Sequence, residues 1–168
     1  MIEFDVLREI QNTASQKQKL EILNKHSDSG NLQYILWFTY NPQIVTGLSK
    51  KKINKSFDLA IKADTDFFEG LFYLEHHNTG KNEDIMHIQQ ILQNLNEQDR
   101  EIAEEIYTKT LNIGLTAKSI NKVFGKDFIP IWEVQQGYPL EDYPFKEGEW
   151  FCISQKMNGC RATLYNGE

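Results

Sequence analysis

The residues best suited to chemistry lie near the C-terminal end, in the pattern Lys156-x-Asn158-Gly159-x-Arg161. An apolar run precedes this pattern and a second one follows it, so a strand, a tight turn and a returning strand are predicted. A lysine amine on a turn can attack an electrophile and form a covalent intermediate. Gly159 would let the backbone approach a nucleotide closely, and the planar donor fork of Arg161 suits a phosphate. The pattern therefore indicates a lysine that attacks an α-phosphate.

The same hairpin has a simpler interpretation. Asn158-Gly159 is a strong signal for an ordinary β-hairpin turn. A lysine beside such a turn would then lie on the surface and have no catalytic role. The residues of the hairpin alone leave both interpretations open.

A second group of residues surrounds a predicted helix start. A turn at Gly114 precedes a helix expected over about 116–124, whose first residues are Thr116, Ala117, Lys118 and Ser119, followed by Lys122. Unbonded backbone N–H groups and the helix dipole make such an end a candidate phosphate site. Hydroxyls and lysines there would add phosphate contacts that do not read base sequence. The alternative is an ordinary capped helix, because Thr is common at helix starts.

Two further groups of residues suggest less specific chemistry. A basic run could touch a nucleic-acid backbone, although such runs are more often solvated loops; it contains Lys50, Lys51, Lys52 and Lys55. None of the four histidines pairs with a cysteine at metal-ligand spacing, so no metal site is predicted. His76 and His77 are instead expected at the end of a helix, where a cation is favourable.

The composition restricts the class of protein. The net charge of −6 argues against a broadly basic nucleic-acid binder, so any such site must be a local patch. No apolar stretch approaches the roughly 18 residues needed to span a membrane. The N-terminus lacks the features of a signal peptide, and Cys152 and Cys160 lie in one short hairpin. We therefore expect a reduced, cytoplasmic protein without a membrane partner.

Periodic apolar residues predict that helices over residues 1–124 position the Gly114 turn. Ser15 and Asn96 are expected to begin helices, the latter with Asp99 at the third helical position in a variant of the capping box. Ser29-Gly30 is expected to break the chain before another helical stripe. Asn41-Pro42 is expected to end a helix, because the residue before proline is pushed out of helical geometry. Thr65 is the expected cap of a helix that carries several aromatic residues. Four aromatic side chains are expected in the core: Trp37, Phe67, Phe68 and Phe72.

The composition changes after the last predicted helix. Residues 126–149 contain three of the four prolines, and a strand-like pattern begins at Glu149. We therefore predict a mainly α protein. An all-helical domain over 1–130 is followed by a linker over 131–145, and a β-hairpin within 146–168 begins an α+β domain. An isolated hairpin is marginally stable, so the tail after Lys146 should pack on other chain segments or be mobile.

Taken in order, these features resemble the N-terminal part of an ATP-dependent DNA ligase of the bacteriophage type. The helical region is followed by Leu111-x-Ile113-Gly114 and a short helix, then by Ile129-Pro130 and a proline-rich connection, and finally by the Lys156 hairpin. The stretch from Glu9-Ile10 through Ser15-Gln16-Lys17-Gln18-Lys19 to Asn24-Lys25 is similar to the opening of such enzymes. So is Ser119-Ile120-Asn121-Lys122-Val123-Phe124.

The resemblance implies a role for each group of residues. Residues 1–130 would be a DNA-binding domain that grips nicked double-stranded DNA, with phosphate contacts from Gly114, Thr116, Ala117, Lys118, Ser119 and Lys122. Lys156 would be adenylated by ATP with Mg²⁺, and Asn158, Gly159 and Arg161 would help to bind the nucleotide. AMP would then pass to a 5′-phosphate, and a 3′-hydroxyl would seal the nick, as in DNA repair, replication or recombination.

The sequence departs from the family pattern in three respects. Asn158 stands where Asp is commoner, and Ser154 stands where ligases often have Glu or Gln near the adenine, with Gln155 one place away. The later nucleotide-binding and metal-binding motifs of the family do not occur within the 168 residues. We therefore expect an N-terminal ligase fragment that is inactive alone. The alternative is a non-enzymatic, all-α interaction domain encoded by a phage or prophage.

Overall fold

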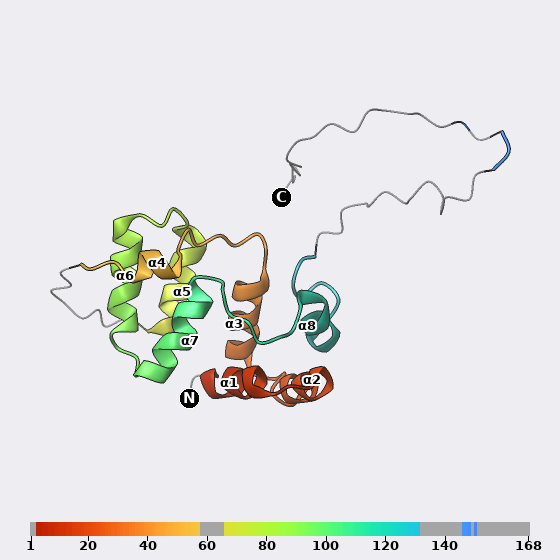
Figure 1. The fold of residues 1–168 in the computed structure, drawn as a ribbon, viewed down its shortest axis with the longest axis horizontal. Helices are drawn as coiled ribbons and strands as arrows, with labels where there is room; N and C mark the ends of the chain where they lie inside the picture. Colours follow the sequence, from red (N-terminus) through yellow and green to blue (C-terminus); the bar gives the residue numbers. More distant parts are fainter. Residues whose placement is uncertain (1–2, 58–65, 132–145, 149, 151–168) are drawn as a thin grey trace. The chain divides into compact units, whose positions relative to one another are not determined.

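The computed structural model describes residues 3–57, 66–131, 146–148 and 150. By its internal contacts the chain divides into two units, Met1–Trp132 and Glu133–Glu168. The described residues form eight α-helices and no strand, and all of the helices belong to the first unit (Figure 1). The prediction of a mainly helical protein is confirmed for this part of the chain. The predicted C-terminal hairpin lies outside the described residues.

The helices of the first unit pack in two connected groups. In chain order they are α1 (Phe4–Asn12), α2 (Gln16–Lys25), α3 (Gly30–Tyr40), α4 (Lys50–Ile53), α5 (Phe67–His76), α6 (Asn82–Leu92), α7 (Glu97–Tyr107) and α8 (Ala117–Phe124). Helices α5, α6 and α7 pack against one another, and the short α4 lies against α6 and α7. Helix α2 packs between α1 and α8, while α3 contacts α7. Helices α2 and α8 therefore lie side by side at one end of the unit (Figure 1).

Most of the predicted helix boundaries are confirmed. Ser29 Oγ accepts a hydrogen bond from the Leu32 amide at 3.2 Å, as an N-cap should. Asn41 follows the last residue of α3, as predicted from the proline after it. Ser15 is the N-cap of α2, although its side chain makes no capping hydrogen bond. His76 ends α5 and His77 follows it, so the predicted position of both histidines is confirmed.

The prediction that Thr65 caps α5 is wrong, because Asp66 is the N-cap. The Asp66 carboxylate accepts a hydrogen bond from the Glu69 amide at 2.9 Å, and Glu69 Oε2 accepts one from the Asp66 amide at 3.1 Å. This reciprocal pair is a capping box, which satisfies two backbone donors at once. Thr65 has no acidic residue or glutamine three places later, so it could not form the same pair.

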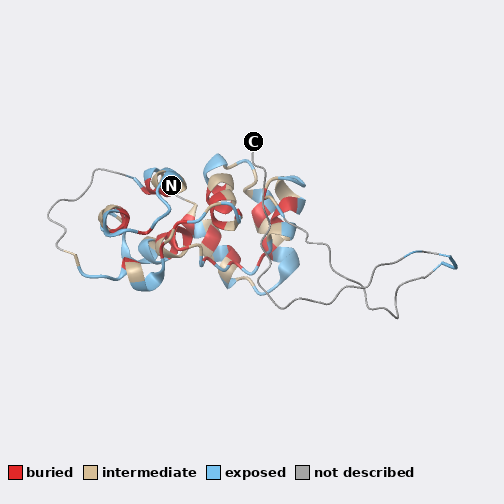
Figure 2. Ribbon diagram, turned by 90° about the horizontal axis from the view of Figure 1, so that it is seen from above, coloured by how far each residue is buried: buried red, intermediate tan, exposed pale blue. Residues whose placement is uncertain are grey.

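A single hydrophobic core joins the helices, and buried residues line their inner faces (Figure 2). Its aromatic centre joins α1, α5 and α7. Phe4 packs edge-on against Phe67 with ring centroids 4.9 Å apart, and Phe67 lies 5.2 Å from Tyr107. The fully buried Tyr107 donates its hydroxyl to the Phe67 carbonyl at 2.8 Å, which satisfies the one polar atom of its side chain.

Of the four aromatic residues predicted in the core, Phe72 is placed wrongly. Its side chain is 64% exposed and lies against His76, with ring centroids 4.9 Å apart. The buried stripe of α5 contains Phe67, Leu71 and Leu74. Phe72 lies one residue further around the helix than Leu71, so its side chain points away from this stripe. Phe67 is buried, while Trp37 and Phe68 are partly buried against the core.

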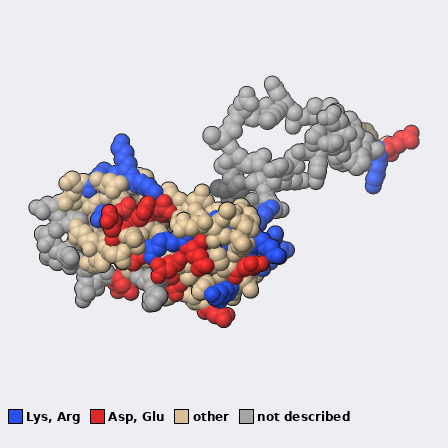
Figure 3. All heavy atoms as spheres, turned by 60° about the horizontal axis from the view of Figure 1, so that its bottom comes forward, with Lys and Arg blue, Asp and Glu red and all other residues tan. Residues whose placement is uncertain are grey.

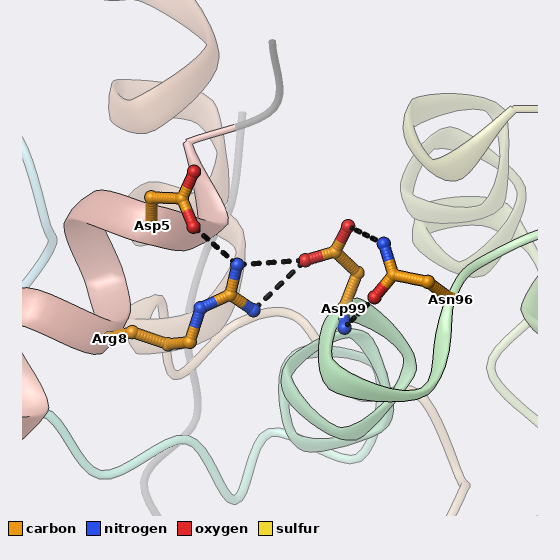
Figure 4. Close-up of polar contacts among 4 residues, drawn as sticks. All are labelled: Asp5, Arg8, Asn96 and Asp99. Atoms are coloured by element: carbon orange, nitrogen blue, oxygen red, sulfur yellow. Dashed lines mark hydrogen bonds and ion pairs between the residues drawn. The ribbon is translucent and has the colours of Figure 1, made fainter.

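Arg8 links α1 to the start of α7 (Figure 4). Its Nη1 and Nη2 atoms each donate to Asp99 Oδ1 at 2.9 Å, and Nη2 also donates to Asp5 at 2.5 Å. Asp99 Oδ2 accepts from the side-chain amide of Asn96 at 2.6 Å, while Asn96 Oδ1 accepts from the Asp99 amide at 2.9 Å. Asn96 and Asp99 thus form the predicted pair at the helix start. The Asp99 carboxylate, however, accepts from the side-chain amide of Asn96 and not from its backbone amide.

Candidate nucleic-acid interface

The structure brings together all six residues that the sequence assigned to phosphate contacts. Thr116 is the N-cap of α8, and its Oγ1 accepts from the Ser119 amide at 3.3 Å and lies 3.1 Å from Ser119 Oγ. Gly114 precedes it with a φ of +70°, a backbone conformation that favours glycine. Four of the six residues are exposed, and Ala117 and Ser119 are half-buried; the exposed ones are Gly114, Thr116, Lys118 and Lys122.

The amide donors at this helix start are fewer than a bare helix end would offer. The Gly114 amide donates to Asn112 Oδ1 at 2.9 Å, which closes a local side-chain turn. The Ser119 amide is bonded to Thr116. Among the described residues, the Ala117 amide, which is the first of the helix, donates no hydrogen bond. Ala117 is therefore the backbone position best placed to meet an anion.

Two helices hold the turn that leads into α8. Lys19 Nζ of α2 donates to the Ile113 carbonyl at 2.6 Å, and Gln16 Nε2 donates to the Gly114 carbonyl at 2.6 Å. Tyr40, at the end of α3, also meets Ile113. Burial raises the pKa of the Tyr40 hydroxyl, and a backbone hydrogen bond from Ile113 acts in the opposite direction. The position of Gly114 is thus fixed by α2 and α3.

The other end of α8 is anchored by Asn121, which is buried. Its Nδ2 donates to the carbonyls of Lys126 and Ile129, both at 2.8 Å, and its Oδ1 accepts from the Ile129 amide at 2.9 Å. With both ends of the helix fixed, Lys118 and Lys122 are exposed one turn apart. Residues four apart lie on the same side of a helix, so the two lysines share one face.

Charge is unevenly distributed over the first unit. We name α2, residues 112–116 and α8 the α2–α8 surface. Helix α2 carries Lys17, Lys19 and Lys25 against a single acid, Glu21, and α8 carries two lysines and no acid. Helix α7 carries one base, Arg100, against Glu97, Asp99, Glu101, Glu104 and Glu105. In Figure 3, Lys and Arg side chains lie at the end formed by α2 and α8 and also elsewhere on the unit, with acidic side chains between and beside them.

The basic run around α4 is partly used inside the protein. Lys50 forms an ion pair with Glu105 at 3.1 Å, and Lys52 Nζ donates to the Gly47 carbonyl at 2.6 Å. Lys51 and Lys55 are exposed. The run therefore begins with a short helix, α4, that is tied to neighbouring segments, and not with the solvated loop that the sequence suggested.

Two residues of the α2–α8 surface were not assigned a role from the sequence. Gln16 and Lys19 hold the Gly114 turn across more than 90 positions in the chain. In the sequence, Gln16 and Lys19 belong to the stretch Ser15–Lys19, which resembles phage ligases. That resemblance does not indicate their contacts with residues 113 and 114. The residues predicted to bind the nucleotide lie outside the described part of the structure: Lys156, Asn158, Gly159 and Arg161.

No protein-family model matches the chain, and no curated protein matches it significantly. Within the described residues, no three His, Cys, Asp or Glu side chains are grouped so that they could hold a metal ion. None of the helices described here combines the length and apolar character required to cross a bilayer. The fold and the site together define an all-helical unit with a local basic surface at one end.

Proposed function

We propose that the helical unit binds nicked double-stranded DNA through its phosphate backbone, as the N-terminal part of an ATP-dependent DNA ligase. The α2–α8 surface carries this proposal, because it concentrates exposed lysines and a fixed helix start in a chain of net charge −6. Thr116, Lys118 and Lys122 suit contacts that position a protein on DNA without reading its sequence. The order of motifs in the sequence supports the same family.

The proposed catalytic group of the full-length enzyme is Lys156. Its Nζ attacks the α-phosphorus of ATP, a P–N bond forms and pyrophosphate leaves. AMP then passes to the 5′-phosphate at the nick, and the 3′-hydroxyl displaces AMP as the phosphodiester forms. Asn158, Gly159 and Arg161 would bind the nucleotide, and a bound Mg²⁺ would supply positive charge to its phosphates. The support for this part of the proposal is the sequence pattern alone.

A gel-shift titration of the 168-residue protein with nicked duplex DNA tests the proposal. Binding should fall steeply between about 50 and 200 mM salt, because phosphate contacts release counterions. The double substitution Lys118→Gln with Lys122→Gln should weaken binding and reduce the salt slope by about two, roughly one for each lysine replaced. The matched control is Lys51→Gln with Lys55→Gln, which removes the same charge from the basic run. A folded protein that does not bind at low salt would refute the proposal.

The alternative is an all-α interaction domain without a role in ligation. The observation that favours it is the exposed ring of Phe72 on α5, together with the acidic net charge. A folded protein without DNA affinity, which captures a protein partner through the α5 face, would support this alternative. Phe72→Ser should then abolish capture, whereas it should leave the proposed DNA binding unchanged.

A further inference from the structure

Lys19 is a buried cation that lacks an anionic partner in the described part of the protein. Its side chain is 6% exposed, and lysine is almost never buried unless it is paired. An ammonium has three donors, and the acceptor that the structure gives it is the neutral carbonyl of Ile113 at 2.6 Å. None of the ion pairs among the described residues includes Lys19. Within the described residues, the buried charge is therefore hydrogen-bonded but has no ion-pair partner.

Such an arrangement is unfavourable for stability alone. A buried charge without its opposite partner is costly, and an apolar residue of similar size would fill the same space without that cost. A lysine at this position is better explained by an anion that comes from outside the chain. The anion must reach the ammonium from a side that protein atoms leave open.

Gly114 lies directly against the ammonium group of Lys19. A Cβ at position 114 would stand 2.6 Å from Lys19 Nζ and 3.4 Å from its Cε. Gly114 is exposed, so the ammonium lies directly beneath a surface turn that has no side chain to cover it. The bond from Gln16 to the Gly114 carbonyl holds the turn in this place. Glycine is thus favoured here by its positive φ, and a side chain at this position would also displace the ammonium of Lys19.

We propose that Lys19 supplies the buried counter-charge for a DNA phosphodiester seated on the Gly114 turn. This inference rests on the proposed function and adds to it a residue that holds the turn and neutralises the phosphate. One ammonium donor keeps the bond to Ile113, and a second one faces the phosphate. The Ala117 amide and the Thr116 hydroxyl lie at the adjoining helix start, where the dipole of α8 also favours an anion. The contact is to the backbone, so it does not depend on base sequence.

The first test compares Lys19→Met with Lys51→Met in the 168-residue protein. Lys51 is an exposed lysine of α4, outside the α2–α8 surface, so it controls for the loss of one charge. Lys19→Met should weaken binding to nicked duplex about tenfold or more at about 50 mM salt and reduce the salt slope by about one. Lys51→Met should change neither by more than about twofold.

The outcomes separate this inference from the proposed function. If the wild type binds nicked duplex and Lys19→Met binds equally well with the same salt slope, the role of Lys19 is refuted while the DNA-binding function stands. If the folded wild type does not bind, both fail. Circular dichroism and thermal unfolding of each variant show whether a loss of binding reflects a loss of the fold.

A second measurement uses the wild type and does not depend on the folding of a variant. In protein labelled with ¹⁵N and ¹³C, the Lys19 Nζ resonance should shift at saturation with nicked duplex and show a scalar coupling to a backbone ³¹P. Inorganic phosphate at the same ionic strength is the second arm, and it should give neither effect at millimolar concentration. An unchanged Lys19 signal at DNA saturation refutes the inference. A shift with inorganic phosphate but not with DNA also refutes it, because the site would then take a free anion.

Discussion

The main chains of Gly47 and Gly80 pack against each other where the loop between α3 and α4 meets the loop between α5 and α6. Both have positive φ, +65° and +59°. A Cβ at position 80 would stand 2.7 Å from the carbonyl carbon of Gly47, and one at position 47 would stand 2.7 Å from the Gly80 nitrogen. Lys52 donates to the Gly47 carbonyl at the same place. The two backbones are thus in direct contact, so there is no room for a side chain at position 47 or at position 80.

Gly80→Ala is therefore expected to be strongly destabilising. The substitution combines backbone strain, about 1–3 kcal/mol for a residue other than glycine in this region, with overlap against main-chain atoms that cannot move aside. We expect a loss of about 3 kcal/mol or more in the free energy of unfolding. Gly30→Ala is the matched control, because a Cβ there meets nothing within 4 Å; it should change stability by less than about 1 kcal/mol. Similar urea midpoints for the two variants would contradict this interpretation.

The link from Arg8 to Asp99 should contribute more to stability than the link from Arg8 to Asp5. The Arg8 and Asp99 side chains are 27% and 24% exposed, whereas Asp5 is 71% exposed. Hydrogen bonds between charged groups contribute about 1.5–3 kcal/mol when water is partly excluded, and exposed pairs contribute about 0–1 kcal/mol. Asp99→Asn should thus lower the free energy of unfolding by at least about 1 kcal/mol, and Asp5→Asn by less than about 0.5 kcal/mol. A double-mutant cycle with Arg8→Met measures each coupling, and equal couplings would argue against the difference.

His87 should make the protein less stable in mild acid. The centroid of its ring lies 4.2 Å from that of Tyr73. Burial lowers the pKa of His87, and the charge of His77 lowers it further. The carboxylates of Glu69 and Asp84 act in the opposite direction. The unfolded chain, with a pKa near 6.5, then binds more protons than the folded one. Stability is fully present above that pH and falls as the pH drops through the folded pKa. Thermal unfolding between about pH 7 and 5 should show a smaller loss for His87→Gln than for the wild type; parallel curves would exclude this role.

The starts of helices depend on residues that are close in the sequence, so most of them could be predicted from the sequence. Ser29, Asn96 and Thr116 cap helices because each offers a side-chain acceptor to an amide three positions later. Asp66, and not the expected Thr65, caps α5, because Glu69 lies three residues after Asp66 and accepts a hydrogen bond from its amide. Residue type alone predicts Phe72 in the core, but its angular position on α5 turns its side chain outward. These two errors concern local geometry that the sequence does contain.

The rest of the candidate site depends on contacts between distant parts of the chain. Nothing near Lys19 in the sequence indicates that its ammonium meets Ile113, because 94 positions separate them. The net charge of −6 likewise gives no sign that acids collect on α7 while lysines remain on α2 and α8. Folding creates both the buried cation and the local basic surface, so sequence patterns could indicate the helix start at Gly114 but not what lies beneath it.

The 168-residue protein should not label itself when it is incubated with labelled ATP and Mg²⁺. A lysine can displace pyrophosphate only where other groups neutralise the charge that develops on the α-phosphate. The sequence carries a lysine pattern that resembles the one in ATP-dependent DNA ligases, but not the later nucleotide-binding and metal-binding motifs of those enzymes. Denaturing electrophoresis should thus show no adenylated band, with Lys156→Ala as the control. A band in the wild type that is absent from Lys156→Ala would contradict the prediction and show that these residues form a working nucleotide site.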